Sequence, residues 1–496
     1  MTLSTEFTSQ ILQLLPQVEA EKLFHAIENT EPSVAIRLNA AKCNPADAAQ
    51  VPGERVPWCR RGFYLSERQP FTFDPLLHAG AYYVQDASSM ILQHIVEQLV
   101  TEPVRYLDLC AAPGGKTTAA IDALPHGSLM VTNEIMPDRA RVLLENVVKW
   151  GNPDCVVTSD SSDRFGSLSH FFDVIAADVP CSGEGMFRKD AEAMAQWSPR
   201  LVEQCAERQR EIIDNIWQAL RPGGLFIYST CTYNRAEDEA MVEYIMAEYS
   251  AESIDLHFPE EWLVRPGIDT EAHCYRFMPH RTRGEGLFVA VLRKPGDEPH
   301  AQVAASGKKG LKDLGGKGNL GGKQGKKQPN ANFGAKAGKN ASFCVPAEAL
   351  TWLDGEFMLT SDASGTASAI PTAFSGEIAA LRSAVRVLHA GVEVATLKGR
   401  DAVPSQSLAL STVLNRKAFA MAELDYATAI AYLRGESITL PDASLPRGIV
   451  AVSYRGMVLG FVKNLGNRAN NLYPREWRIK STHIPSAAPK ILPTAE

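Results

Sequence analysis

The stretch "VRYLDLCAAPGGKTTAAIDAL", residues 104–124, decides the fold of this chain, because it predicts an apolar strand, a glycine turn and a helix. The pattern repeats over residues 128–151, and further apolar strands are predicted at 154–160, 171–181 and 225–231. The fourth strand, "FFDVIAADVPC", is continuously apolar, which is typical of a strand covered on both faces. This alternation of strand and helix indicates an α/β fold with a parallel sheet between two layers of helices.

The glycine turn of this stretch departs from both common phosphate-binding patterns. A P-loop has the pattern G-x-x-x-x-G-K-[ST]. The segment Gly115–Thr117 fits its end, but Cys110 stands where its first glycine belongs. Pro113 removes a backbone N–H donor, and the dinucleotide pattern G-x-G-x-x-G is absent. The turn therefore predicts a close approach of the backbone to a nucleoside-type ligand, without a phosphate cradle.

Acidic residues end two of the predicted strands. Glu134 follows the second strand and Asp160 ends the third. Ligands of parallel sheets collect beyond the carboxyl ends of the strands, where Glu134 can accept hydrogen bonds from ribose hydroxyls and Asp160 from an exocyclic amine. Taken singly, each acid is more often a solvated or capping residue than a ligand-binding one. Together they predict a nucleoside site, and the missing phosphate cradle favours S-adenosylmethionine over a dinucleotide.

Two cysteines end the fourth and fifth predicted strands. Cys181 lies in "ADVPCSGEG" (177–185) and Cys231 in "YSTCTYNRAEDE" (228–239). Because both positions are at carboxyl ends of strands, these thiols are candidates for a functional site rather than for the core.

Composition and the chain start indicate a globular protein of a reducing compartment. The chain has 496 residues, 45% of them hydrophobic and 22% charged, a length that predicts two or three domains. Its nine cysteines contain no C-x-x-C pair, so we expect neither a disulfide framework nor a metal site. The first 23 residues predict a helix rather than a signal peptide, and no apolar run approaches the ~20 residues that span a bilayer. We expect a cytoplasmic protein without membrane contact.

Charge is unevenly distributed along the chain. The formal net charge is −7, yet residues 301–340 hold nine lysines, ten glycines and one aspartate. This segment has too few apolar residues to fold and predicts a basic flexible linker, which can also attract phosphates. The predicted parts are a mainly helical N-terminal domain with one possible strand at 33–42 (1–75), the α/β domain (76–296), the linker (297–343) and a C-terminal β-rich module (344–496).

Five motifs follow one another along the chain. They are "YYVQDASSM" (82–90), "DLCAAPGGKT" (108–117), "ADVPCSGEG" (177–185), "YSTCTYNRAEDE" (228–239) and "PHRTRGEGLFVAVLRK" (279–294). In this order they resemble the Nop2/Sun family of RNA 5-cytosine methyltransferases, over about residues 30–295. Residues 397–411 and 458–479 resemble the PUA-like tail of one bacterial branch of that family, which modifies a cytosine in the decoding region of small-subunit (16S) ribosomal RNA.

The resemblance implies a Rossmann-like class I methyltransferase with a small N-terminal RNA-binding domain and a C-terminal PUA-like, β-rich module. It also implies S-adenosylmethionine as cofactor and ribosomal RNA or the small ribosomal subunit as partner, and we expect a monomer. The residues expected to bind the cofactor are Cys110, Ala111, Ala112, Pro113, Gly114, Gly115, Lys116, Glu134, Asp160 and Asp178.

Two thiols suit methylation of cytosine at carbon 5, which is a poor nucleophile. A thiolate that adds at carbon 6 turns carbon 5 into an enamine carbon, and a second thiol can assist release. In the family resembled, the Thr-Cys cysteine attacks, which nominates Cys231 as nucleophile and Cys181 as release thiol. In DNA cytosine methyltransferases the Pro-Cys cysteine attacks, which would reverse the roles. Asn234 and Glu237 predict a helix start after Cys231, and a helix N-terminus stabilises a thiolate.

Asp178 and Lys116 complete the catalytic candidates. We expect Asp178 to orient the cytosine amine and ring nitrogen, or the methyl donor. Lys116 is either within reach of Asp178 or a solvated side chain at a helix start.

A base that meets a thiol in a pocket must leave its stack, so base flipping is implied. Arg188, Lys189, Arg281 and Arg283 are candidates for holding the RNA backbone, or ordinary surface charges. Residues 467–479, "NRANNLYPREWRI", predict either an RNA-contacting surface or the packed end of a module.

Other functions stay open at this point. The same chemistry on tRNA or DNA is one alternative, although a PUA-like tail argues against DNA. A non-catalytic RNA-binding factor in ribosome assembly is another. The presence of both cysteines together with Glu134 and Asp178 argues against it, because binding alone requires none of them.

Overall fold

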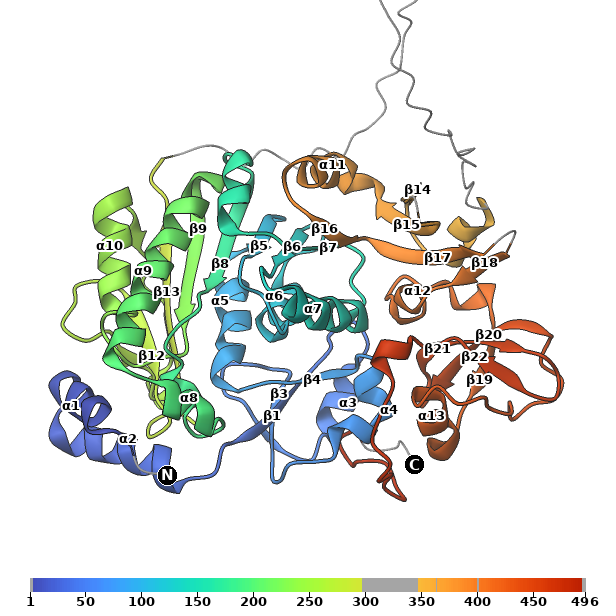
Figure 1. Ribbon diagram of the computed structural model, residues 1–496, viewed down its shortest axis with the longest axis horizontal. Helices are drawn as coiled ribbons and strands as arrows, with labels where there is room; N and C mark the ends of the chain where they lie inside the picture. Colours follow the sequence, from blue (N-terminus) through green and yellow to red (C-terminus); the bar gives the residue numbers. More distant parts are fainter. Residues whose placement is uncertain (1–2, 297–346, 363, 399–400, 493–496) are drawn as a thin grey trace, which may run out of the picture.

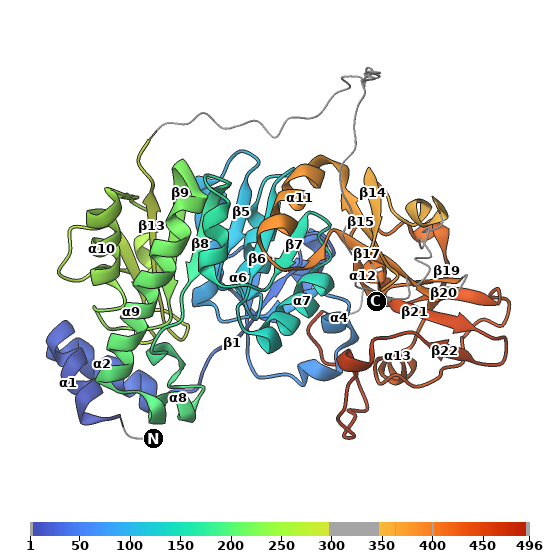
Figure 2. The ribbon, with the colours of Figure 1, turned by 45° about the horizontal axis from the view of Figure 1, so that its top comes forward.

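The computed structural model describes residues 3–296, 347–362, 364–398 and 401–492. A large central sheet occupies the middle of the molecule, with the helices of residues 5–29 at one end and the β-rich C-terminal part at the other, beside the strand β7 (Figures 1 and 2). The predicted linker, residues 297–343, lies outside the described residues.

The central sheet has ten strands, in the order β11-β12-β13-β9-β8-β5-β6-β7-β16, with β10 beside β13. Five of them are parallel, as predicted: β5 (Arg105–Asp108), β6 (Leu129–Asn133), β7 (Cys155–Thr158), β8 (Phe172–Asp178) and β9 (Leu220–Thr230). Antiparallel strands extend the sheet beyond β9: β10 (Glu252–Ser253), β11 (Arg265–Pro266), β12 (Cys274–Phe277) and β13 (Leu287–Arg293).

Both faces of the parallel strands are buried, because successive residues of a strand point to opposite sides. Tyr106 packs in one core and its neighbour Leu107 in another. The first core is covered by α5 (Ile91–Leu99), α6 (Gly115–Ala123) and α7 (Pro137–Trp150), and the second by α9 (Pro199–Ile216) and α10 (Glu239–Tyr249). This double cover explains the continuous apolar runs of the sequence, and the predicted α/β fold class is confirmed.

The N-terminal part combines helices with a sheet that the sequence did not predict. Its four strands lie in the antiparallel order β2-β3-β1-β4. The elements are α1 (Thr5–Leu14), α2 (Gln17–Asn29), β1 (Val34–Leu38), α3 (Pro45–Gln50), β2 (Glu54–Arg55), β3 (Gly62–Leu65), α4 (Pro75–His78) and β4 (Tyr82–Val84). The strand expected within residues 33–42 is β1.

The C-terminal part is rich in strands, as predicted. Two four-stranded sheets have the orders β14-β15-β17-β18 and β19-β20-β21-β22. The strands are β14 (Phe357–Ser361), β15 (Thr366–Pro371), β17 (Val392–Lys398), β18 (Asp401–Pro404), β19 (Ala420–Glu423), β20 (Gly448–Tyr454), β21 (Met457–Asn464) and β22 (Ala469–Asn471). The helices are α11 (Ser375–Ala384), α12 (Gln406–Leu410) and α13 (Tyr426–Leu433).

One C-terminal strand belongs to the central sheet. β16 (Val387–Ala390) pairs antiparallel with β7 and forms the edge of the ten-stranded sheet. The residues that complete the α/β sheet therefore come from both sides of segment 297–346, which no sequence pattern predicted.

Candidate active site

The predicted site residues gather at the carboxyl ends of neighbouring parallel strands. Asp178 is the last residue of β8, Glu134 follows β6 directly and Asp160 follows β7. The glycine turn leads from β5 to α6, with Gly114 at φ 111° as the residue before the helix. Because the strand order is β9-β8-β5-β6-β7, these residues and Cys231 at the end of β9 lie along one edge of the sheet.

Buried polar side chains hold the glycine turn and the start of α6. Thr117 Oγ1 donates to Asp108 Oδ2 over 2.6 Å, and burial raises the pKa of Asp108 to about 7. Arg37 of β1, fully buried, donates to Thr118 Oγ1 (2.6 Å) and to Asp122 Oδ2 (2.6 Å). The small N-terminal sheet thus positions the helix that carries Lys116. Asp108 lies in a quoted motif, whereas the role of Arg37 left no recognisable signal in the sequence.

Glu134 is 2% exposed and is held in one orientation. Its Oε1 accepts from the Met136 N–H (2.9 Å), and its Oε2 pairs with Arg139 (3.2 Å). Arg139 also donates to the Ala112 carbonyl of the glycine turn over 2.9 Å. Ile135, between Glu134 and Met136, is 58% exposed. An apolar side chain therefore lies beside the fixed carboxylate of Glu134.

Asp160 is held by both side-chain and main-chain bonds. Asn133 accepts from its N–H (3.0 Å) and donates to its carbonyl (2.9 Å). Its carboxylate accepts from the N–H groups of Ser161 (3.1 Å) and Arg386 (3.1 Å).

Asp178 and Lys116 form an ion pair, with 2.8 Å between Oδ2 and Nζ. Ser229 of β9 donates to the other oxygen of Asp178 over 2.8 Å. Burial lowers the pKa of Lys116, but the Asp178 carboxylate more than offsets this and the pKa lies above its usual value. Lys116 is therefore not a freely solvated side chain.

The two thiols lie together, with 3.2 Å between the sulfur atoms of Cys181 and Cys231. The hydrogen bond to Cys231, together with burial, raises the pKa of the Cys181 thiol. All eight cysteines within the described residues are free, and burial also raises the pKa of the Cys110 thiol in the glycine turn.

The predicted helix start at Asn234 is wrong, because α10 begins at Glu239. Asn234 and Glu237 exchange two hydrogen bonds, of 2.9 and 2.7 Å, but these close a turn before the helix. The buried Arg276 donates to Glu239 over 2.7 Å at the actual helix start.

Glu237 instead links the loops that carry the two thiols. Its Oε2 accepts from the Ser182 N–H (2.9 Å), next to Cys181, and from Gln209 Nε2 (2.8 Å) of α9. Ser182 and Thr232, which follow the two cysteines, are also joined through their hydroxyl groups at 3.1 Å. These bonds explain how two thiols from different loops stay in contact.

Glu184 is a second buried carboxylate between these loops, and the sequence analysis did not single it out although it lies in "ADVPCSGEG". It is fully buried and accepts four hydrogen bonds. The donors are Gln10 Nε2 (3.0 Å), Trp197 Nε1 (3.0 Å), Tyr233 N (2.7 Å) and Asn234 Nδ2 (3.1 Å). One side chain thus connects α1, the Cys181 loop and the Cys231 loop.

The four basic residues predicted to hold RNA are engaged in ion pairs. Arg188, whose side chain is 7% exposed, pairs with Glu285, and Lys189 lies 3.6 Å from the same carboxylate. Arg281 pairs with Glu19 (3.3 Å), and Arg283 pairs with Glu54 (2.9 Å). Arg188 is therefore structural, whereas the half-exposed Arg283 can still contact a ligand.

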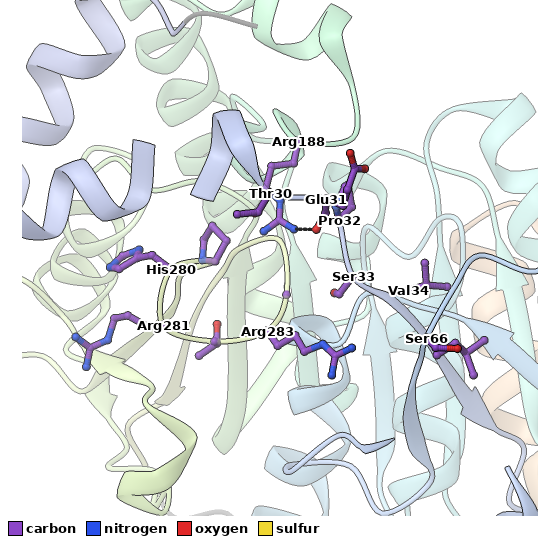
Figure 3. A pocket seen from close by; sticks show the side chains of 14 residues that line it. Thr30, Glu31, Pro32, Ser33, Val34, Ser66, Arg188, His280, Arg281 and Arg283 are labelled. Carbon is purple, nitrogen blue, oxygen red and sulfur yellow. Dashed lines mark hydrogen bonds between the residues drawn. The ribbon is translucent and has the colours of Figure 1, made fainter. Parts of the chain in front are cut away.

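The three arginines of this set, Arg188, Arg281 and Arg283, line a cavity of about 440 Å³ between the N-terminal part and residues 279–284. Figure 3 shows Arg188 directed to the Glu31 carbonyl, with the side chains of Arg281 and Arg283 extending in opposite directions from their loop.

Segment 467–479 packs against the module through three buried residues. Ala469, Tyr473 and Ile479 are buried in the core that the C-terminal sheet shares with the N-terminal part. Arg468 and Arg475 are exposed. The prediction that this segment is the packed end of a module is therefore correct for these three residues.

The arrangement suits a cationic nucleoside better than a phosphate ligand. Glu134, Asp160 and Asp178 place three carboxylates at neighbouring strand ends, and a carboxylate attracts a sulfonium and repels a phosphate. Among the described residues, no group of three or more His, Cys, Asp and Glu side chains could hold a metal ion. Nor does that part of the chain contain a helix long and apolar enough to cross a membrane.

Comparison with known proteins agrees with this geometry. The sequence matches the family 16S rRNA methyltransferase RsmB/F over residues 98–293. It also matches the N-terminal domain of 16S rRNA methyltransferase RsmF over 3–87 and the methyltransferase RsmF PUA domain over 420–479.

Two relatives extend over nearly the whole chain. Ribosomal RNA small subunit methyltransferase F of Erwinia tasmaniensis is 30% identical over 95% of both chains. That of Shewanella oneidensis is 30% identical over 96% of this chain and 97% of its own.

Solved structures share the central fold. A methyltransferase homolog from Pyrococcus horikoshii is 25% identical with a TM-score of 0.52, and the match covers 59% of this chain and 95% of the other. NSun6 from Pyrococcus horikoshii with SFG has a TM-score of 0.51 at 19% identity, covering 59% and 99%. The predicted methyltransferase fold with a PUA domain is confirmed, and the chain belongs to the ribosomal RNA small subunit methyltransferase F family.

Proposed function

We propose that this methyltransferase transfers a methyl group from S-adenosylmethionine to carbon 5 of a cytosine in small-subunit ribosomal RNA. The observation that carries the proposal is the contact between Cys181 and Cys231, 3.2 Å apart, beside an acid-lined row of strand ends. A binding protein would require neither the thiol pair nor these carboxylates.

The cofactor would be held by the glycine turn and the three carboxylates. Residues 110–116 would bring the main chain close to the ligand. Glu134 would accept hydrogen bonds from the ribose hydroxyls, and Asp160 would accept one from the exocyclic amine. Ile135, exposed beside Glu134, offers an apolar surface to the purine ring. When bound, S-adenosylmethionine supplies an electrophilic methyl group on its sulfonium sulfur.

Cys231 is the proposed nucleophile. Its thiolate forms a bond to carbon 6 of the cytosine, and the electrons of the 5,6 double bond make carbon 5 nucleophilic. Cys181 keeps its proton, because its pKa is raised by the hydrogen bond to Cys231 and by burial. It therefore stabilises the neighbouring thiolate as a hydrogen-bond donor.

Release of the methylated cytosine requires the bond between Cys231 and carbon 6 to break. Once carbon 5 carries the methyl group, its proton passes to water, the electrons of that C–H bond re-form the 5,6 double bond, and the bond between sulfur and carbon 6 breaks to return the Cys231 thiolate. We assign assistance in this release to Cys181. Asp178, fixed by Lys116 and Ser229, orients the cytosine.

Ribosomal RNA is the proposed substrate because the relatives named for it match from the N-terminal domain to the PUA domain. The half-exposed Arg283, which stacks on Tyr64 at 4.2 Å, is the strongest candidate for contact with the RNA backbone. The alternatives, tRNA or DNA as substrate or a non-catalytic assembly factor, predict different products in the experiment below.

The test uses the full chain with S-adenosylmethionine and either 16S ribosomal RNA or small ribosomal subunits. Cys181→Ala is expected to accumulate a covalent protein–RNA adduct on a denaturing gel, because addition proceeds and release is slowed. Cys231→Ala is expected to form no adduct and to lose activity. Cys205→Ala, a thiol of α9 outside the pair, is the matched control and should resemble wild type.

Adduct formation by Cys231→Ala but not by Cys181→Ala would reverse the assigned roles. Bisulfite sequencing of total RNA with and without the gene identifies the modified base. A mark lost only from tRNA, or no lost mark at all, would contradict the proposed substrate.

A further inference from the structure

The edge strand β16 brings the C-terminal part against the proposed cofactor site. It pairs with β7 through Val387 opposite Thr158 and Ala390 opposite Val156. Asp160 follows β7, and Arg386 precedes β16. Because the strands are antiparallel, the end of β7 lies beside the beginning of β16, and these two residues meet.

Arg386 contacts the proposed cofactor site through its main chain. Its carbonyl accepts from the Ser159 N–H over 3.0 Å. Its N–H donates to Asp160 Oδ2 over 3.1 Å, between residues 226 positions apart in the sequence. The other oxygen of Asp160 accepts from the Ser161 N–H over 3.1 Å. The Arg386 side chain itself is exposed.

The segment that carries Arg386 is firmly anchored. Ile378 and Leu381 of α11 and the following Val385 are at most 5% exposed, and they pack in the same core as Val156 of β7 and Phe165. The N–H that faces Asp160 is therefore held by the C-terminal part as a rigid element and not by a free loop.

We propose that the Arg386 main-chain N–H is a positioning group for cofactor binding. It restricts the Asp160 carboxylate to one orientation. In that orientation the remaining lone pairs of the carboxylate can accept a hydrogen bond from the exocyclic amine of S-adenosylmethionine. The inference rests on the proposed function, which assigns Asp160 to that amine. It adds that the C-terminal module contributes to cofactor affinity, independently of any contact with RNA.

Proline tests this group, because it has no N–H. Val385, at φ −132° and ψ 160°, already has the conformation that a residue before proline adopts, and position 386 precedes the first paired residue of β16. Arg386→Pro should therefore remove one hydrogen bond and keep the Ser159 bond. Arg386→Ala removes the side chain and keeps the N–H, which makes it the matched control.

The first measurement is the Kd of S-adenosylhomocysteine for the full chain, by calorimetry without RNA. One hydrogen bond corresponds to about a three- to tenfold change in affinity. We expect a Kd raised by this factor in Arg386→Pro and a change below about twofold in Arg386→Ala. An unchanged Kd in Arg386→Pro would overturn the inference.

A second ligand separates positioning from general damage. An analogue of S-adenosylhomocysteine with hydrogen in place of the exocyclic amine should bind less tightly to wild type and to Arg386→Ala. In Arg386→Pro the ratio of the two dissociation constants should shrink toward one. Equal weakening of both ligands would mean that the substitution merely disturbs the fold, and the inference would be wrong.

Wild-type protein provides a test that does not depend on the proline variant folding. Saturation with S-adenosylhomocysteine should slow hydrogen exchange of the Arg386 amide several-fold, because its acceptor becomes fixed by ligand. Unchanged exchange would overturn the inference. Absence of any binding to wild type would instead contradict the proposed function, so the two failures are distinguishable.

Discussion

Asp108 shows how burial changes the ionisation of a single residue beside the proposed cofactor site. Its carboxyl group is 2% exposed, and burial raises its pKa from 3.8 to about 7. The folded chain therefore holds the proton more tightly than the unfolded chain. The resulting stabilisation is fully present below about pH 4 and is lost as the pH rises through about 7.

Asp108→Asn is expected to remove this pH dependence, because the amide cannot ionise. Between pH 5 and 7, the free energy of unfolding of the variant should rise relative to wild type by up to about 1.4 kcal/mol per pH unit. Urea unfolding of both proteins without cofactor at a series of pH values measures the difference. Parallel pH curves for the two proteins would show that Asp108 ionises normally.

At the scale of elements, the thiol pair depends on two loops that buried carboxylates join. Glu184 accepts hydrogen bonds from both the α1 side and the Cys231 loop, through Gln10 and Tyr233. Its four donors require four acceptor positions, which a carboxylate provides and an amide does not. The loops are therefore specified by contacts to one side chain rather than by their own conformational preferences.

Glu184→Gln is expected to lower the free energy of unfolding by about 1–3 kcal/mol, since at least one buried donor then faces another donor. Methyl transfer should fall as well, because the two sulfurs lose their fixed separation. Glu192→Gln, an exposed residue of the short helix α8 (Ala191–Gln196), is the control and should change stability little. Equal stability of the two variants would refute this role for Glu184.

At the scale of the whole molecule, the parts before and after segment 297–346 share one hydrophobic core. Leu381 of α11 is fully buried and belongs to the same cluster as Val156 and Ile175 of the central sheet. Arg37 likewise joins the N-terminal sheet to α6. We therefore expect these parts to unfold together.

Leu381→Ala is expected to destabilise the whole protein by about 2–5 kcal/mol, through lost burial and a cavity. Hydrogen exchange of β7 should accelerate with that of α11. Leu350→Ala, at a residue 38% exposed, should change stability by less than about 0.5 kcal/mol. If only residues after 347 exchanged faster in Leu381→Ala, the C-terminal part would be an independent folding unit.

Several features could be predicted from sequence because each depends on neighbouring residues. The parallel strands follow from apolar runs, and the place of Glu134, Asp160 and Cys231 follows from where those runs end. The predicted helix start at Asn234 was wrong, although Asn234 and Glu237 have the spacing of a helix cap. Its polar groups are used instead by distant segments, through the bonds of Glu237 to Ser182 in the opposite loop and to Gln209 of α9.

By itself, the sequence determined the α/β class, the glycine turn, the acids at the strand ends and the presence of two thiols. Only the tertiary structure decided that the two sulfurs touch, that Arg188 is paired within the protein, and that β16 completes the sheet. Gln10 with Glu184 and Arg386 with Asp160 are 174 and 226 positions apart. Such contacts arise when whole elements pack together, and a local pattern of residues carries no record of which distant segment will be its neighbour.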